Sequence, residues 1–143
     1  MKHKVCIVVG KYYQDVTDDL IKGATSLLDK YKKLEYKILQ VPGVFEIPLV
    51  ISINIKKYNA FIALGCVIKG DTPHFDLISS AAINGIMDLS IKHQKPITNG
   101  IVTCLNKKQA KERCNPNKKN KGGEAAQALL HLLGFSKNQN ESK

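Results

Sequence analysis

Four runs in which apolar residues predominate recur along the chain, with longer mixed segments between them. They cover residues 5–9, 34–41, 61–68 and 97–105. The first and third are almost continuously apolar, which is typical of strands buried on both faces. The mixed segments carry apolar residues at the spacing of amphipathic helices. The alternation of the two patterns predicts parallel strands connected by helices.

Capping residues mark the ends of several of these helices. Thr17 is expected to cap the first helix, with two aspartates in its first turn. Asn106 caps a short helix that runs through Cys114, and the last helix is expected over about residues 122–133, ended by Gly134. This order of elements predicts a three-layer, flavodoxin-like α/β domain: a four-stranded parallel sheet with helices on both faces.

The segment 45–55 has conflicting signals. Every odd position in it is apolar, a period of two that is typical of a strand. Pro48, however, disfavours a central strand and fits the first turn of a helix. A right-handed crossover between parallel strands also requires a covering helix here. We therefore predict a helix.

The dipeptide Asn99-Gly100 usually indicates a hairpin turn. The arm before it would be too short to form the first strand of a hairpin. We therefore interpret both residues as part of the fourth strand, near a ligand or a neighbouring chain.

The third apolar run ends abruptly in polar residues. Gly70, Asp71 and Thr72 favour a turn, and Pro73 fits the first position of a helix whose N-cap is Thr72. A helix start directly after a buried strand offers free backbone N–H groups, which bind anions. His74, in the first turn, is a candidate for contacting a phosphate or moving a proton. A surface histidine without a function is the alternative interpretation.

Other candidate residues follow the carboxyl ends of the strands, where ligands bind in such sheets. Tyr12 is suited to stack on a planar ring, and the Glu46 carboxylate to accept hydrogen bonds from hydroxyl groups. Arg113 and Lys121 belong to a basic group suited to phosphate or carbonyl recognition. For each residue a structural role is the alternative: packing for Tyr12, helix-dipole complement for Glu46 and a solvated basic face for the cations.

The composition narrows the class of protein. The chain has 143 residues, 43% of them hydrophobic, which predicts one domain over residues 1–143 with a disordered tail at 136–143. No apolar run approaches a membrane span, and the chain leads directly into a strand, so we expect a cytoplasmic protein without a membrane partner. Four cysteines without a Cys-x-x-Cys pair predict buried free thiols.

The formal net charge of +10 raises the question of whether the chain binds nucleic acid. The lysines are dispersed, without interleaved aromatic residues or a nucleic-acid-binding motif, so we predict no nucleic-acid partner. A positive field that attracts a phosphorylated small molecule fits the helix start at His74 better.

Three stretches together resemble one enzyme family. They are VPGVFEIP at 41–48, LGCVIKGDTPHFD at 64–76 and NKGGEAA at 120–126. The chain is similar to the lumazine synthase (6,7-dimethyl-8-ribityllumazine synthase) family from about Val5 to Leu133, with the motifs in matching order and spacing.

The resemblance implies a reaction and a set of site residues. The family condenses 5-amino-6-(D-ribitylamino)uracil with 3,4-dihydroxy-2-butanone 4-phosphate to 6,7-dimethyl-8-ribityllumazine, releasing phosphate and water, in the penultimate step of riboflavin biosynthesis. It implies no metal and no organic cofactor, and it makes His74 the catalytic proton-transfer residue. Residues implied to bind the pyrimidine and ribityl group are Tyr12, Val44, Phe45, Glu46, Val67, Ile68, Asn99 and Lys121. Those implied to bind the phosphate are Gly70, Asp71, Thr72 and Arg113.

The resemblance also implies a homopentamer with sites shared between adjacent chains, Arg113 and Lys121 coming from the neighbour. Some members form decamers or shells of sixty subunits. This chain differs from many relatives in three ways: it begins almost at its first strand, Asn99 replaces an aromatic residue, and Asn-Pro-Asn at 115–117 precedes the last helix. A binding protein for flavin or lumazine that has lost turnover is the alternative on the same fold.

Overall fold

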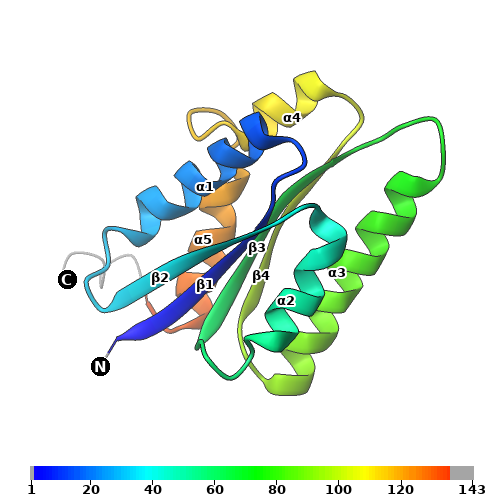
Figure 1. Cartoon of the computed structure of the whole chain (residues 1–143). Helices are drawn as coiled ribbons and strands as arrows, with labels where there is room; N and C mark the ends of the chain where they lie inside the picture. The colour runs from blue at the N-terminus through cyan, green and yellow to red at the C-terminus, as the bar shows by residue number, and fades with distance from the viewer. Residues whose placement is uncertain (1, 136–143) are drawn as a thin grey trace.

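The computed structural model describes residues 2–135 and contains one parallel four-stranded sheet (Figure 1). The strand order is β2-β1-β3-β4, with β1 His3–Gly10, β2 Leu34–Val41, β3 Ala60–Ile68 and β4 Ile97–Cys104. The helical elements are α1 (Gln14–Leu28), the 3-10 helix η1 (Val44–Glu46), α2 (Ile47–Ile53), α3 (His74–His93), α4 (Lys107–Cys114) and α5 (Lys121–Leu132).

Helices cover both faces of the sheet, as the sequence predicted. Helices α1, α4 and α5 lie on one face and α2 and α3 on the other (Figure 1). Strand β1 shows why its sequence lacks alternation: Val5 and Ile7 pack toward one helical layer, while Cys6 and Val8 pack toward the other. All four side chains are fully buried. Both layers therefore require apolar residues from the same strand. The predicted fold class is confirmed.

The segment 45–55 is helical, as predicted, in the form of η1 followed by α2. The period-two pattern of its apolar residues was therefore misleading. Ile47 and Ile51, four residues apart on one face, are buried, whereas Leu49 and Ile53 point away from the core and are exposed. Asn99 and Gly100 lie within β4, as predicted. A Cβ atom at Gly100 would lie 2.5 Å from Leu64 Cδ2 and 3.0 Å from the Ala63 carbonyl oxygen, so glycine allows close packing against β3 there.

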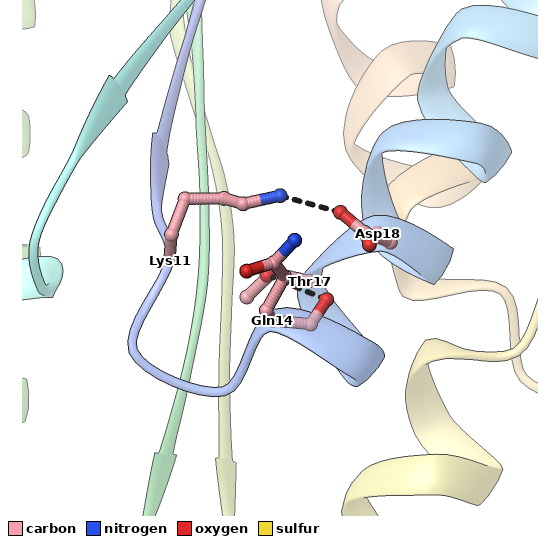
Figure 2. Close-up of polar contacts among 4 residues, drawn as sticks. All are labelled: Lys11, Gln14, Thr17 and Asp18. Carbon is pink, nitrogen blue, oxygen red and sulfur yellow. Dashed lines mark hydrogen bonds and ion pairs between the residues drawn. The ribbon is translucent and has the colours of Figure 1, made fainter.

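The start of α1 differs from the prediction. Thr17 is not the N-cap; it lies inside the helix, fully buried, and its hydroxyl donates to the Gln14 carbonyl at 3.2 Å (Figure 2). The helix begins at Gln14, and the Thr17 amide already donates to the Tyr13 carbonyl at 3.0 Å, so the Thr17 backbone is part of the helix rather than its cap. Asp18 consequently lies beyond the first turn and forms an ion pair with Lys11 instead.

Smaller shifts occur at several other element ends, three of them at the candidate loops and the last helix. Helix α3 begins at His74 with Pro73 at the N-cap position, one residue later than expected, and the Thr72 hydroxyl accepts a hydrogen bond from the His74 amide at 3.4 Å. Helix α5 begins at Lys121, and β4 ends at Cys104 rather than Leu105. The predicted Asn106 cap of α4 is confirmed, since its side chain accepts from the Gln109 amide.

None of the helices found between residues 2 and 135 combines the length and apolar character needed to cross a membrane. The expected disordered tail at 136–143 lies outside the described residues.

Candidate active site

A pocket of about 470 Å³ opens at the carboxyl ends of β1 and β3. It brings together seven candidate residues from three separate segments of the chain: Tyr12, Val44, Phe45, Glu46, Val67, Ile68 and His74. The two strands end beside one another because they are parallel and adjacent in the sheet. The same arrangement therefore places the loop after β1, the η1 segment and the start of α3 around one space.

The η1 segment is held tightly over the strand ends. A Cβ atom at Gly10 would lie 2.7 Å from the Gly43 carbonyl carbon, and one at Gly65 would lie 2.4 Å from Val44 Cγ1. Gly10 therefore allows the backbones of the two segments to approach closely, and the missing side chain at Gly65 leaves room for the Val44 side chain. Glu46 Oε1 accepts a hydrogen bond from the Gly43 amide at 2.9 Å. The Glu46 carboxylate is thereby fixed at the pocket wall by its own turn.

The loop that carries Tyr12 is anchored at Lys11. The Lys11 amide donates to the Val41 carbonyl at 2.9 Å, which ties the end of β1 to the end of β2. The Lys11 ammonium reaches across the loop to the Asp18 carboxylate on α1 (Figure 2). Between these anchors the Tyr12 side chain is 77% exposed. An aromatic ring this exposed at a pocket mouth is available for stacking.

The loop between β3 and α3 presents the anion-binding feature that the sequence predicted. Gly70, Asp71 and Thr72 are exposed and precede a helix of 20 residues. Free backbone N–H groups and the positive end of the helix dipole lie together at its start. His74 is the first helical residue and lines the pocket, so an imidazole stands beside these donors. Gly70, Asp71 and Thr72 do not themselves line the 470 Å³ pocket.

Three candidate residues lie elsewhere, in a second pocket of about 420 Å³ along β4 and α5: Asn99, Arg113 and Lys121. Arg113 Nη1 donates to the Thr103 carbonyl at 2.9 Å, which turns the guanidinium toward β4. Lys121 Nζ lies 3.3 Å from Glu124 Oε1, and Asn99 Oδ1 accepts from the Ile101 amide. The two pockets share no lining residue. A single chain therefore does not bring Arg113 and Lys121 to His74.

Four residues that line the first pocket were not among the sequence-based candidates: Tyr13, Gly43, Cys66 and Ile78. Ile78 lies four residues after His74 on the same helix, so helical spacing was sufficient to find it. Cys66 precedes Val67 in β3 and was interpreted only as a buried apolar residue. No pattern in the sequence distinguished Tyr13 from a packing residue.

The predicted buried free thiols are confirmed, and Cys66 in the pocket lining contacts two of the others. The Cys66 thiol is hydrogen-bonded with those of Cys114 and Cys104; the bond to Cys114 and burial raise its pKa well above the ordinary value. Burial also raises the pKa of Cys104 to about 11. Within residues 2–135, no group of three His, Cys, Asp or Glu side chains is arranged to hold a metal ion.

We predict that these thiols react slowly while the chain is folded. Thiolate is the reactive form, and a raised pKa keeps Cys66 and Cys104 protonated at pH 8. Iodoacetamide at pH 8 is expected to label the native protein at least about tenfold more slowly than the protein in guanidinium chloride, where all four cysteines are accessible. Intact-mass spectrometry over time measures both rates. Equal rates in the two conditions would contradict the buried, protonated state.

Comparison with known proteins gives a consistent family match. Residues 2–137 match the family model described as 6,7-dimethyl-8-ribityllumazine synthase. A protein of that name from Afipia carboxidovorans is 42% identical over 137 residues, covering 91% of this chain and 83% of the relative. One from Bartonella tribocorum is 40% identical over 139 residues, covering 95% of this chain and 91% of the relative. A relative named 6,7-dimethyl-8-ribityllumazine synthase 1, from Rhodopseudomonas palustris, is 41% identical over 137 residues.

Proposed function

The chain belongs to the 6,7-dimethyl-8-ribityllumazine synthase family, and we propose that it carries out the family's reaction at a site assembled from both pockets. It is an enzyme of riboflavin biosynthesis that condenses 5-amino-6-(D-ribitylamino)uracil with 3,4-dihydroxy-2-butanone 4-phosphate, releasing phosphate and water. The observation that carries the site assignment is the convergence of Tyr12, Glu46 and His74, from three separate segments, on one pocket.

The 470 Å³ pocket is suited to the pyrimidine substrate. We assign the exposed Tyr12 ring to stack on the pyrimidinedione and the backbone at Val67 and Ile68 to contact its edge. One Glu46 oxygen is held by the Gly43 amide, so the carboxylate is oriented to accept hydrogen bonds from ribityl hydroxyls. The backbone at Val44 and Phe45 continues this side of the pocket.

The start of α3 is suited to the phosphate of the second substrate. Gly70, Asp71 and Thr72 would wrap the phosphate at the positive end of the helix dipole. Phosphate carries negative charge that increases on the leaving oxygen as elimination proceeds, so these donors favour its departure. Arg113 would supply the cationic partner and Lys121 would approach a polar edge of the pyrimidine ring. Asn99 lies beside them in the 420 Å³ pocket.

We assign His74 to proton transfer between the two substrates. The amine of the pyrimidine attacks the ketone, and the resulting carbinolamine loses water to form a Schiff base. That dehydration and the enolisation before phosphate elimination each require a proton to be delivered or removed. The imidazole lines the pyrimidine pocket and stands at the helix start that would hold the phosphate. Alignment of the two reactants supplies a further part of the acceleration.

We propose that the complete site forms between adjacent chains of a homopentamer. Support comes from the separation of the two pockets, since Arg113 and Lys121 of one chain do not reach its own His74 pocket. Exposed apolar side chains on α2 and α3 give a surface for such contacts: Leu49, Ile53, Leu77, Met87 and Ile91. A ring uses heterologous contacts, in which the 420 Å³ pocket of one chain faces the 470 Å³ pocket of the next.

Subunit complementation tests the shared site. His74→Ala and Arg113→Ala chains with different affinity tags are co-expressed, and the doubly tagged oligomers are assayed by lumazine fluorescence below the Michaelis constant of the phosphate substrate. In a randomly mixed ring, roughly one quarter of the sites pair an intact His74 with an intact Arg113, so activity is expected near one quarter of the wild-type value.

Two results would contradict the proposal at different levels. Hybrids as inactive as either variant alone would show that the His74 and Arg113 of each site come from one chain. Wild-type protein that forms lumazine no faster than the uncatalysed mixture, yet binds flavin tightly in calorimetry, would indicate a binding protein instead.

We assign the enzyme to the cytoplasm, because its four free thiols suit a reducing compartment.

A further inference from the structure

The Tyr12 ring has a side-chain neighbour on the loop itself. The Tyr13 ring lies edge-on to it, with a centroid separation of 4.9 Å and an interplanar angle of 86°. This is a favourable aromatic geometry, because the positive edge of one ring meets the negative face of the other. An exposed side chain otherwise changes rotamer readily. The contact therefore limits the orientations of the ring assigned to stack on the pyrimidine.

Tyr13 is itself held from two sides. It is half-buried and packs against the apolar core between the sheet and α1. The Lys107 ammonium also lies 5.2 Å from the ring centroid, within the range of a cation–π interaction. Lys107 is the first residue of α4, which follows β4 and is distant from Tyr13 in sequence. A tertiary contact therefore determines where the Tyr13 ring lies.

Lys107 occupies a helix position at which a positive charge is normally unfavourable. The first turn of α4 contains two lysines and no acidic residue, although the positive end of the helix dipole disfavours cations there. The charge is compensated from α1: Lys107 Nζ lies 3.0 Å from Asp15 Oδ1. The hydrogen bond from Lys107 holds the pKa of the Asp15 carboxyl below its ordinary value. Residues that contradict local preference often serve a tertiary or functional role.

We propose that Tyr13 and Lys107 are positioning residues that set the orientation of the Tyr12 ring for the pyrimidine substrate. Asp15 fixes the Lys107 ammonium, Lys107 and the core fix the Tyr13 ring, and Tyr13 limits the rotamers of Tyr12. This inference rests on the proposed stacking role of Tyr12. It predicts that changes at Tyr13 or Lys107 act on pyrimidine binding and leave the phosphate substrate unaffected.

A double-mutant cycle tests whether Tyr13 acts through Tyr12. Tyr13→Ala is expected to raise the KM of the pyrimidine substrate about threefold to tenfold, with the KM of the phosphate substrate unchanged. In a Tyr12→Ala background the same change is expected to have no further effect on KM, because the ring that it orients is absent. Tyr13→Phe keeps the edge-on ring, so this variant is expected to have the wild-type KM for the pyrimidine substrate.

Lys107→Gln gives a second test of the inference at a partly exposed residue. It is expected to raise the pyrimidine KM about twofold to fivefold, again only when Tyr12 is present. Lys108→Gln is the matched control, since Lys108 is the adjacent, exposed lysine of the same turn, and it should leave both Michaelis constants unchanged. Thermal unfolding midpoints identify any variant whose fold is compromised.

The outcomes separate this inference from the proposed function. Effects of Tyr13→Ala that persist in full in the Tyr12→Ala background would show direct contact with substrate and overturn the positioning role. No effect of Tyr13→Ala and Lys107→Gln in the presence of Tyr12 would overturn it as well, with the enzyme's site assignment intact. A Tyr12→Ala variant with wild-type KM would instead refute the stacking role on which both statements depend.

Discussion

Replacing His74 with alanine is expected to lower kcat by about 10²-fold or more, with only a small change in either Michaelis constant. The imidazole stands at the start of α3 and lines the 470 Å³ pocket, between the surfaces assigned to the two substrates. In the proposed mechanism the imidazole transfers protons and does not hold either substrate. An interaction used only in the transition state changes kcat and not binding. Steady-state lumazine fluorescence with each substrate varied in turn measures both constants.

Two controls distinguish proton transfer from a general disturbance of the helix. Added imidazole is expected to restore part of the activity of His74→Ala, because the deletion leaves space at the pocket wall. His93→Ala removes the same residue type from the opposite end of α3 and should retain wild-type kcat. A His74→Ala enzyme with near-normal kcat and a raised KM would make His74 a binding residue and overturn its catalytic assignment.

Replacing Arg113 with alanine is expected to raise the KM of the phosphate substrate by about 10-fold to 10²-fold, with little change for the pyrimidine substrate. A hydrogen bond to a charged group contributes about 1.5–3 kcal/mol, which corresponds to this range. The Thr103 carbonyl holds one arm of the guanidinium at 2.9 Å and directs it along β4. The remaining donors are then available for a phosphate from the neighbouring chain's pocket.

The basic surroundings of Arg113 require a control for general electrostatic attraction. Lys111→Ala removes one positive charge from an exposed position on the same helix and should leave the phosphate KM within about twofold of wild type. Arg113→Lys keeps the charge but loses the bidentate geometry, so an intermediate KM is expected. An unchanged phosphate KM in Arg113→Ala would remove Arg113 from the site.

Much of the fold was predictable because local patterns and tertiary burial agree. The bounds of β2 were predicted to the residue, and the Asn106 cap of α4 was read directly from the sequence. The prediction failed where burial overrides a capping preference. Thr17 has the chemistry of an N-cap, but the helix begins earlier, at Gln14, and Thr17 is fully buried within it.

The candidate site was predictable in one half and not in the other. Residues that follow the strands share one edge because parallel strands end together, so Tyr12, Glu46 and His74 were expected to converge, and the pocket contains all three. Spacing alone did not reveal that Arg113 lies in a different pocket, although the family resemblance implied that Arg113 reaches the site from a neighbouring chain. Its direction depends on the Thr103 carbonyl, a contact between α4 and β4.

By itself, then, the sequence determined the order of strands and helices, the parallel sheet and the loops that carry the chemistry, because each of these follows from local hydrophobic pattern and turn chemistry. Only the tertiary structure decided which side chains meet. The division of the candidate residues between two pockets and the contact of Lys107 with Tyr13 are examples. Such contacts depend on how helices far apart in the chain pack on a common sheet, and no local pattern encodes that geometry.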